Sequence, residues 1–170
     1  MDYNITLIAA LDPHRVIGYK NQIPWHIPKD LKHFKSLTEG HYVVMGKNTF
    51  DSLNQKPLPN RVNIVLSQTY YRDPPYLENQ TFFVPSLESV LSVFGHEELK
   101  VIGGQQIYEQ FLPLASSLEL THVHQKYLGD TYFPDYKDDF ELISKEVHET
   151  FSYCRYQRLS TLVKTLQHPL

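Results

Sequence analysis

Short apolar runs alternate with helix-like segments along most of this chain, and no other feature constrains its fold as strongly. The first run, from Ile5 to Leu11, is apolar along nearly its whole length and is followed by the turn signal Asp12-Pro13. Such a run is typical of a strand buried on both faces of a sheet. Strands that alternate with helices predict an α/β domain with a predominantly parallel sheet.

A helix is expected after a long loop that runs to about Ile27. Pro28 suits its first position and Gly40 its end, while Leu31, Phe34 and Leu37 continue an apolar stripe from Ile27. The last third lacks a helical pattern, so it predicts an antiparallel hairpin at the sheet edge, made of strands 140–145 and 151–163. The remaining expected elements are strands 42–45, 62–66, 81–84, 99–102 and 118–124 and helices 46–53, 86–94 and 105–112.

The whole pattern predicts a single domain over residues 1–163, with about four helices beside the sheet and a tail of unknown role at 164–170. The net charge is −3 and no dense run of Lys and Arg occurs, so duplex nucleic acid is not an expected partner. No segment approaches the roughly 20 apolar residues of a membrane span, and no membrane partner is expected. The single cysteine, Cys154, excludes an internal disulfide and suits the cytoplasm.

Residues 18–30 carry the first indication of chemistry, because they deliver Asp30 into the first turn of the expected helix. An acidic residue is common there simply because it suits the helix dipole. Phe34, however, lies one turn further along the same face, with Leu31 beside it and Trp25 upstream. A carboxylate in an apolar pocket is costly unless a ligand donates hydrogen bonds to it. We therefore expect Asp30 to bind a ligand, as in an enzyme.

Two junctions between a strand and a helix contain glycine, at residues 45–49 and 102–106. Free backbone N–H groups at such junctions favour phosphate, and Lys47 and Arg61 add positive charge. Together these features indicate a ligand with a pyrophosphate. Neither junction has the G-x-G-x-x-G pattern, so a dinucleotide site here would differ from the common one.

Two other kinds of site are disfavoured. His122 and His124 share one face of an expected strand, but no third ligand follows at a spacing typical of metal sites. A nucleophilic enzyme is also disfavoured, because no G-x-S-x-G motif is present and Cys154 falls within an expected strand.

From residue 3 to residue 160 the chain resembles the dihydrofolate reductase family. The motifs that carry the resemblance are Leu7-Ile8-Ala9-Ala10, Gly18, Asn21, Pro24-Trp25, Pro28, Asp30-Leu31, Val44-Met45-Gly46-Lys47-Asn48-Thr49-Phe50, Pro57-Leu58-Pro59-Asn60-Arg61, Ile102-Gly103-Gly104 through Tyr108, Thr121-His122, Gly129-Asp130-Thr131 and Phe133-Pro134. The resemblance implies reduction of 7,8-dihydrofolate to tetrahydrofolate with NADPH, in support of one-carbon metabolism. It also implies that antifolate inhibitors bind and that the protein is a cytoplasmic monomer.

The same resemblance implies roles for individual residues. Asp30 would orient the pterin and raise the proton affinity of its N5, with Thr121 linking the two, and Trp25 belongs with these catalytic residues. Arg61 would pair with the α-carboxylate of the substrate. The implied substrate contacts are Ile8, Asp30, Leu31, Phe34, Leu53, Leu58, Arg61, Ile102 and Thr121. The implied cofactor contacts are Ala10, Ile17, Gly18, Gly46, Lys47, Asn48, Thr49, Leu66, Ser67, Gly103, Gly104, Gln105, Gln106, Ile107 and Tyr108. A closing loop would include Asn21, Ile23 and Pro24, braced by Asp130.

One departure from the family pattern has a conformational consequence, because Asn60 stands where glycine often precedes the arginine. Asn adopts left-handed backbone angles at low cost, so the change is tolerable. Two alternatives to the reductase stay open at this point. They are a pyrimidine reductase of flavin synthesis, which should lack Arg61 and the pairing of Trp25 with Asp30, and a catalytically silent protein that binds nucleotide or folate.

Overall fold

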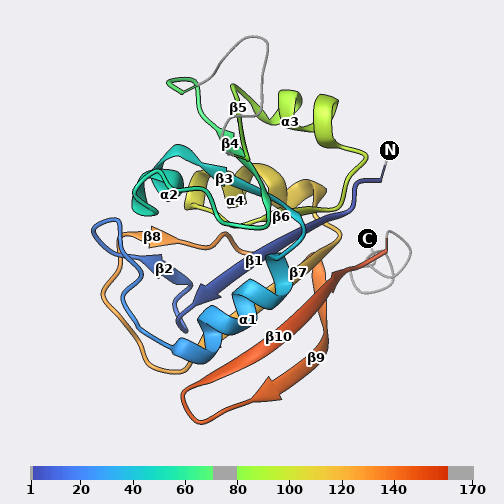
Figure 1. Ribbon diagram of the computed structural model, residues 1–170. Helices are drawn as coiled ribbons and strands as arrows, with labels where there is room; N and C mark the ends of the chain where they lie inside the picture. The colour runs from blue at the N-terminus through green and yellow to red at the C-terminus, as the bar shows by residue number, and fades with distance from the viewer. Residues whose placement is uncertain (1, 71–79, 161–170) are drawn as a thin grey trace.

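The computed structural model describes residues 2–70 and 80–160. Within these ranges a central sheet of eight strands has helices beside it, and a small sheet of two strands lies apart from it (Figure 1). The strands are β1 (Ile5–Leu11), β2 (Val16–Gly18), β3 (Tyr42–Gly46), β4 (Val62–Leu66), β5 (Thr81–Val84), β6 (Leu99–Val101), β7 (Ser117–Val123), β8 (Thr131–Tyr132), β9 (Phe140–Val147) and β10 (Phe151–Arg158). The helices are α1 (Pro28–Thr38), α2 (Lys47–Ser52), α3 (Leu87–Phe94), α4 (Gln105–Phe111) and the 3-10 turn η1 (Leu112–Leu114).

The central sheet has the order β5-β4-β3-β6-β1-β7-β10-β9. Its first six strands are parallel to one another, whereas β10 pairs antiparallel with both β7 and β9. The fold class is therefore confirmed: a mostly parallel sheet carries an antiparallel hairpin at one edge. In Figure 1 this hairpin, coloured orange to red, forms the edge of the sheet next to α1.

Local sequence explains where the elements begin and end. Helix α1 has Pro28 at its first position and is followed by Gly40, whose φ of +79° suits a residue without a Cβ. Ser86 caps α3 by accepting a hydrogen bond from the Ser89 backbone N–H at 3.2 Å. Asn60 has a φ of +60°, so the expected left-handed backbone is confirmed at this position.

One element contradicts the sequence prediction of an unbroken loop before α1. That segment contains β2, which pairs with β8 in the separate sheet. Strands of two or three residues are too short to show a period, so only the three-dimensional pairing reveals them. The last strand, β10, ends at Arg158, so the predicted continuation of this strand is wrong at Leu159 and Ser160, which are described and are not strand. The rest of that continuation, residues 161–163, and the tail 164–170 lie outside the described residues.

The main core lies between the sheet and α4, where Leu7, Leu118, Phe111 and Phe133 are almost fully buried. A smaller apolar cluster of Val43, Met45, Phe50 and Val65 packs beside α2. Within the described part of the chain, no helix is long and apolar enough to cross a membrane. Because six parallel strands end at the same edge of this layered core, loops from distant parts of the sequence meet there.

Candidate functional site

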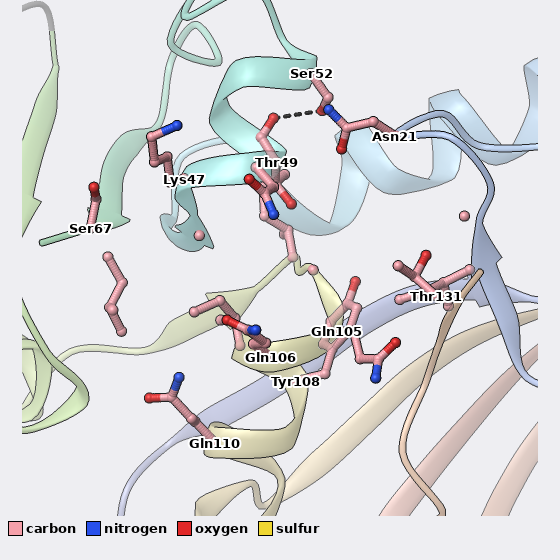
Figure 2. Close-up of a pocket in the computed structure, with 18 of the residues that line it drawn as sticks. Asn21, Lys47, Thr49, Ser52, Ser67, Gln105, Gln106, Tyr108, Gln110 and Thr131 are labelled. Atoms are coloured by element: carbon pink, nitrogen blue, oxygen red, sulfur yellow. Dashed lines mark hydrogen bonds between the residues drawn. The ribbon is translucent and has the colours of Figure 1, made fainter. Parts of the chain in front are cut away.

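A cleft of about 1170 Å³ lies at the carboxyl ends of the parallel strands, between α2 and α4. In Figure 2, Lys47 and Ser67 lie on one side of the cleft, Gln106 and Gln110 of α4 on another, and Asn21 and Thr131 at the far end. Open α/β sheets bind ligands in crevices at this edge because the strand-to-helix turns present free backbone N–H groups there. The cleft is large enough for a dinucleotide, since small-molecule sites commonly have about 300–1,000 Å³.

Every predicted cofactor contact except Gly103 lines this cleft. Gly103 instead joins the two glycine junctions, because its carbonyl accepts a hydrogen bond from the Gly46 N–H at 2.8 Å. It has a φ of +114°, and a Cβ here would meet the Tyr108 ring hydroxyl at 3.0 Å. A Cβ added at Gly104 would lie 3.6 Å from Thr49 Oγ1, its nearest neighbour. The backbone at Gly103 and Gly104 therefore lies close to the cleft but does not fill it.

Sequence reasoning missed part of the cleft wall. The residues missed are Gln22, Ser52, Gln68, Pro85, Ser86, Leu87, Glu88, Gln110 and Thr131. Residues 85–88 follow β5 and open α3, and β5 lies beside β4 in the sheet. The strand order brings them to the cleft, and a single sequence does not reveal strand order. The sequence indicated Ser86 as a helix cap, but nothing in the sequence indicated that Ser86 lines the cleft.

The expected pairing of Asp30 with Thr121 is present as a direct contact. Thr121 Oγ1 of β7 donates a hydrogen bond of 2.6 Å to Asp30 Oδ1 of α1. Burial raises the pKa of the Asp30 carboxyl, while the hydrogen bond from Thr121 and the nearby His33 act in the opposite direction. The carboxylate thus has one fixed donor and lies in partly apolar surroundings, so a ligand that donates further hydrogen bonds would stabilise its charged form.

Strand register places one predicted substrate contact, Ile8, and one predicted cofactor contact, Ala10, on the same face as this pair. Ala10 pairs with Thr121 across β1 and β7, and Ile8 lies two residues before Ala10, so both point toward α1. Leu31 on α1 is 56% exposed, which is unusual for a residue of an apolar helix stripe. Leu31 is therefore not part of the core, although it belongs to the predicted apolar stripe. Trp25 does not line the large cleft and instead packs against Tyr127, with ring centroids 5.2 Å apart.

Three further predicted substrate contacts, Leu53, Leu58 and Ile102, pack against the small apolar cluster beside α2. Arg61 is only 7% exposed. Its Nε donates to the Pro59 carbonyl and its Nη1 to Thr38 Oγ1, both at 2.9 Å. Burial lowers the pKa of this guanidinium, and no ion pair to it occurs within the described residues. A buried cation fixed in this way is ready to receive an anionic group.

The loop before α1 is attached to the molecule through Asp130. Asp130 Oδ2 accepts a hydrogen bond from the Lys20 N–H at 2.9 Å, and the Asp130 N–H donates to the Gly18 carbonyl at 3.0 Å. Ile23, further along the loop, is 62% exposed and lines the cleft, as does Asn21, whereas Pro24 does not. This arrangement fixes the base of the loop and leaves an apolar side chain exposed at the cleft entrance.

His33 is a neighbour of Asp30 that sequence reasoning assigned to no site. Its ring stacks on Tyr153 of β10, with centroids 3.8 Å apart and planes 21° from parallel. Tyr153 in turn donates to the Lys29 carbonyl at 3.1 Å. The imidazole is thereby held one helical turn from Asp30, where its positive charge lowers the pKa of that carboxyl.

Replacing His33 with glutamine should therefore raise the pKa of Asp30, because a cation that favours the carboxylate is removed. The measurement is a carboxyl ¹³C NMR titration, with the Asp30 signal assigned from its loss in Asp30→Asn. His96→Gln is the matched control, since His96 pairs with Glu97 at the end of α3 and should leave the midpoint of Asp30 unchanged. A midpoint that stays put or moves to lower pH in His33→Gln would contradict this prediction.

The described residues hold no group of three or more His, Cys, Asp and Glu side chains arranged to bind a metal ion. His122 Nε2 instead contacts the Tyr156 hydroxyl at 2.8 Å, and His124 Nε2 contacts Ser152 Oγ at 2.9 Å. Cys154 is a free thiol on β10, so its predicted place in a strand is confirmed, and it is buried.

Comparison with known proteins gives a consistent result. The dihydrofolate reductase family model matches residues 4–160. Dihydrofolate reductase of Bacillus subtilis (strain 168) is 42% identical over 145 residues, covering 84% of this chain and 83% of that protein. Dihydrofolate reductase type 3 of Salmonella typhimurium is 46% identical over 133 residues, covering 78% and 79%. A solved structure of the Enterococcus faecalis enzyme, complexed with NADP(H) and RAB-propyl, has a TM-score of 0.80 at 30% identity and covers 94% of this chain and 100% of that one.

The fold and the site define an α/β protein with a nucleotide-sized cleft and a half-buried carboxylate close to the same sheet edge. The matches above are specific and cover most of the chain. The chain belongs to the dihydrofolate reductase family.

Proposed function

We propose that this chain performs the family reaction, reduction of 7,8-dihydrofolate to 5,6,7,8-tetrahydrofolate, with NADPH in the large cleft and the pterin beside Asp30. The observation that carries this assignment is the Thr121–Asp30 hydrogen bond of 2.6 Å on the sheet face that also bears Ala10. It puts a partly desolvated carboxylate on the same face as a residue of the cleft wall. A pterin held there can lie against the nicotinamide end of the cofactor.

The cleft suits NADPH in both size and lining. The N-termini of α2 and α4 open into it, and backbone N–H groups there favour phosphate oxygens. Lys47 supplies positive charge, although its Nζ also pairs with Asp51 at 2.9 Å. Lys47, Asn48, Thr49 and Ser67 are proposed to hold the phosphates. When bound, NADPH supplies the hydride that the pterin accepts at C6.

Asp30 is proposed to accept hydrogen bonds from the 2-amino group and N3 of the pterin. Its negative charge raises the proton affinity of N5, which receives a proton through water rather than from the carboxyl itself. Thr121 keeps the carboxylate oriented, because its hydroxyl is already bound to Oδ1. A proton transfer assisted in this way typically gains about 10²–10⁴-fold in rate.

The remaining proposed substrate contacts are a set of apolar residues and one cation, Arg61. The apolar residues are proposed to hold the pterin and the benzoyl ring; they are Ile8, Leu31, Phe34, Leu53, Leu58 and Ile102. Arg61 is proposed to bind the α-carboxylate of the glutamate, because a buried, pre-oriented guanidinium matches that group in shape and charge. Antifolate inhibitors are expected to occupy the same site.

The segment from Gly18 to Trp25 is proposed to close over the bound ligands and exclude water. Its attachment to Asp130 at one end and to α1 at the other would let the residues around Ile23 move while both ends stay fixed. Closure would bury the exposed Ile23 side chain against the nicotinamide and pterin.

We further propose one domain over residues 1–163 that works as a cytoplasmic monomer. The buried free thiol of Cys154 suits a reducing compartment, and the net charge of −3 does not favour nucleic acid.

The direct test mixes the protein, NADPH and 7,8-dihydrofolate and follows nicotinamide absorbance. We expect a loss of absorbance that requires both dihydrofolate and protein, and that an antifolate abolishes. Reduction of a pyrimidine precursor of flavins instead would support the pyrimidine reductase. Binding of NADPH and folate without turnover would identify a silent binding protein, and either result would overturn the proposal.

A further inference from the structure

A second cavity, of about 340 Å³, lies on the opposite face of the sheet from Asp30. Leu11, His122 and Ser152 pair with one another across β1, β7 and β10, so their side chains share one face. Thr121, the residue before His122, points to the other face, where it binds Asp30. This cavity, here termed the back pocket, is therefore separate from the large cleft and the pterin site.

The back pocket is lined by an excess of basic side chains. Arg15, Lys137 and Lys145 line it together with His122 and His124. None of the first three forms an ion pair with a described residue; Arg15 donates to the Phe133 carbonyl at 2.7 Å. These three basic residues line one small cavity in a chain whose net charge is negative.

Two acidic residues at the back pocket, Asp12 and Asp135, already accept hydrogen bonds from backbone N–H groups. Asp12 is the one acidic residue in the lining, and its carboxylate accepts backbone N–H groups from His14, Val16 and Tyr127 at 2.8 to 2.9 Å. Asp135, which acts electrostatically on Tyr136, accepts the Lys137 N–H at 3.2 Å. The cations of the lining consequently lack a carboxylate directed at them from within the pocket.

The pKa of His122 reflects the burial of this side chain and the positive charge around it. Burial lowers the pKa of its imidazole, and Lys145, Lys137 and His124 lower it further. Its Nε2 is held by the Tyr156 hydroxyl at 2.8 Å, so the ring stays at the pocket wall. An anion placed among these groups would relieve their mutual repulsion.

We propose that the back pocket binds a small organic phosphate. The phosphate would lie among Arg15, Lys137 and Lys145, because a dianion matches several converging cations. The pocket also has apolar and aromatic walls, including Leu142, Tyr136 and Tyr156, which suit an attached organic group. This site is independent of the residue roles proposed above for folate reduction.

The test uses full-length protein labelled with ¹⁵N-histidine and saturated with NADPH, so that phosphate cannot enter the large cleft. Phenyl phosphate is titrated at constant ionic strength, and the imidazole signals of His122 and His124 are followed by NMR. We expect a saturable shift of both signals, and the midpoint of His122 should move to higher pH. Inorganic phosphate should bind several-fold more weakly, because it lacks the organic group.

The double variant Lys137→Gln/Lys145→Gln should weaken phenyl phosphate binding by about tenfold or more, since two nearby cations are lost. The matched control Lys35→Gln/Lys56→Gln makes the same change of charge at exposed sites elsewhere and should bind as the wild type does. Equal shifts with chloride, or equal affinity in the two double variants, would overturn the proposal. Equal affinity for inorganic and phenyl phosphate would refute the organic class of ligand.

Discussion

Asp30→Asn should lower the turnover of dihydrofolate at neutral pH by about 10²–10⁴-fold. Asparagine keeps the size of the side chain and can still accept a hydrogen bond from Thr121, but it carries no charge to raise the proton affinity of N5. The affinity for NADPH should stay unchanged, because Asp30 does not line the cofactor cleft. Steady-state turnover and NADPH fluorescence titration measure the two quantities separately.

The pH dependence of this variant follows from the raised pKa of Asp30. Below that pKa the wild-type carboxyl is also neutral, so the difference in turnover between wild type and variant should narrow as pH falls. Burial makes the charged carboxylate unfavourable in the folded state, so the folded state loses stability as pH rises from the unfolded-state pKa to the raised folded-state pKa, and the full cost is present above it. Asp30→Asn should therefore melt no lower than the wild type at neutral pH. Unchanged turnover at neutral pH would show that Asp30 has no such role.

Arg61→Leu should raise KM for dihydrofolate by roughly 10²-fold and leave kcat nearly unchanged. Losing one partner of a buried charge pair costs roughly 2–5 kcal/mol, and each 1.4 kcal/mol is about tenfold in affinity. The contact exists equally in the ground state and the transition state, so it affects binding rather than the chemical step. Thr38 Oγ1 would keep its own hydrogen bond to the Phe34 carbonyl, at 2.8 Å.

The control for Arg61 is a dihydropterin that lacks the benzoyl-glutamate group. On this substrate Arg61→Leu and the wild type should have nearly equal KM values, because the carboxylate is missing. A fall in kcat alone, or an equal loss on both substrates, would show that Arg61 does not bind the carboxylate.

The sequence predicted those parts of the molecule whose signals are local. The apolar run Ile5–Leu11 became β1, and proline and glycine marked the ends of α1. The features that sequence reasoning missed depend on non-local contacts. Strand β2 is too short to show a period and is recognised only by its pairing with β8. Residues 85–88 reach the cleft only through the order of the strands in the sheet. Periodicity also cannot distinguish a core-facing stripe from a ligand-facing one, so the exposure of Leu31 emerged only from the packed structure.

The residues of the candidate site also fall into those that local motifs predicted and those that only the three-dimensional contacts reveal. The family motifs gave Asp30 and Thr121 as a pair, and the structure has them in direct contact. His33 lies in none of those motifs, and its place beside Asp30 depends on stacking with Tyr153, more than a hundred residues away in sequence. Contacts of that kind require the register of β10 on β7, which a single sequence does not provide.

Thr121 and His122 are consecutive on β7 but face opposite sides of the sheet, one toward Asp30 and the other into the back pocket. One peptide unit therefore connects the two sites. Thermodynamic linkage requires reciprocity: any factor by which an anion behind β7 changes folate affinity is the factor by which folate changes the affinity for that anion. If the two proposed sites are coupled, measuring folate affinity with and without the anion, and anion affinity with and without folate, should give the same factor.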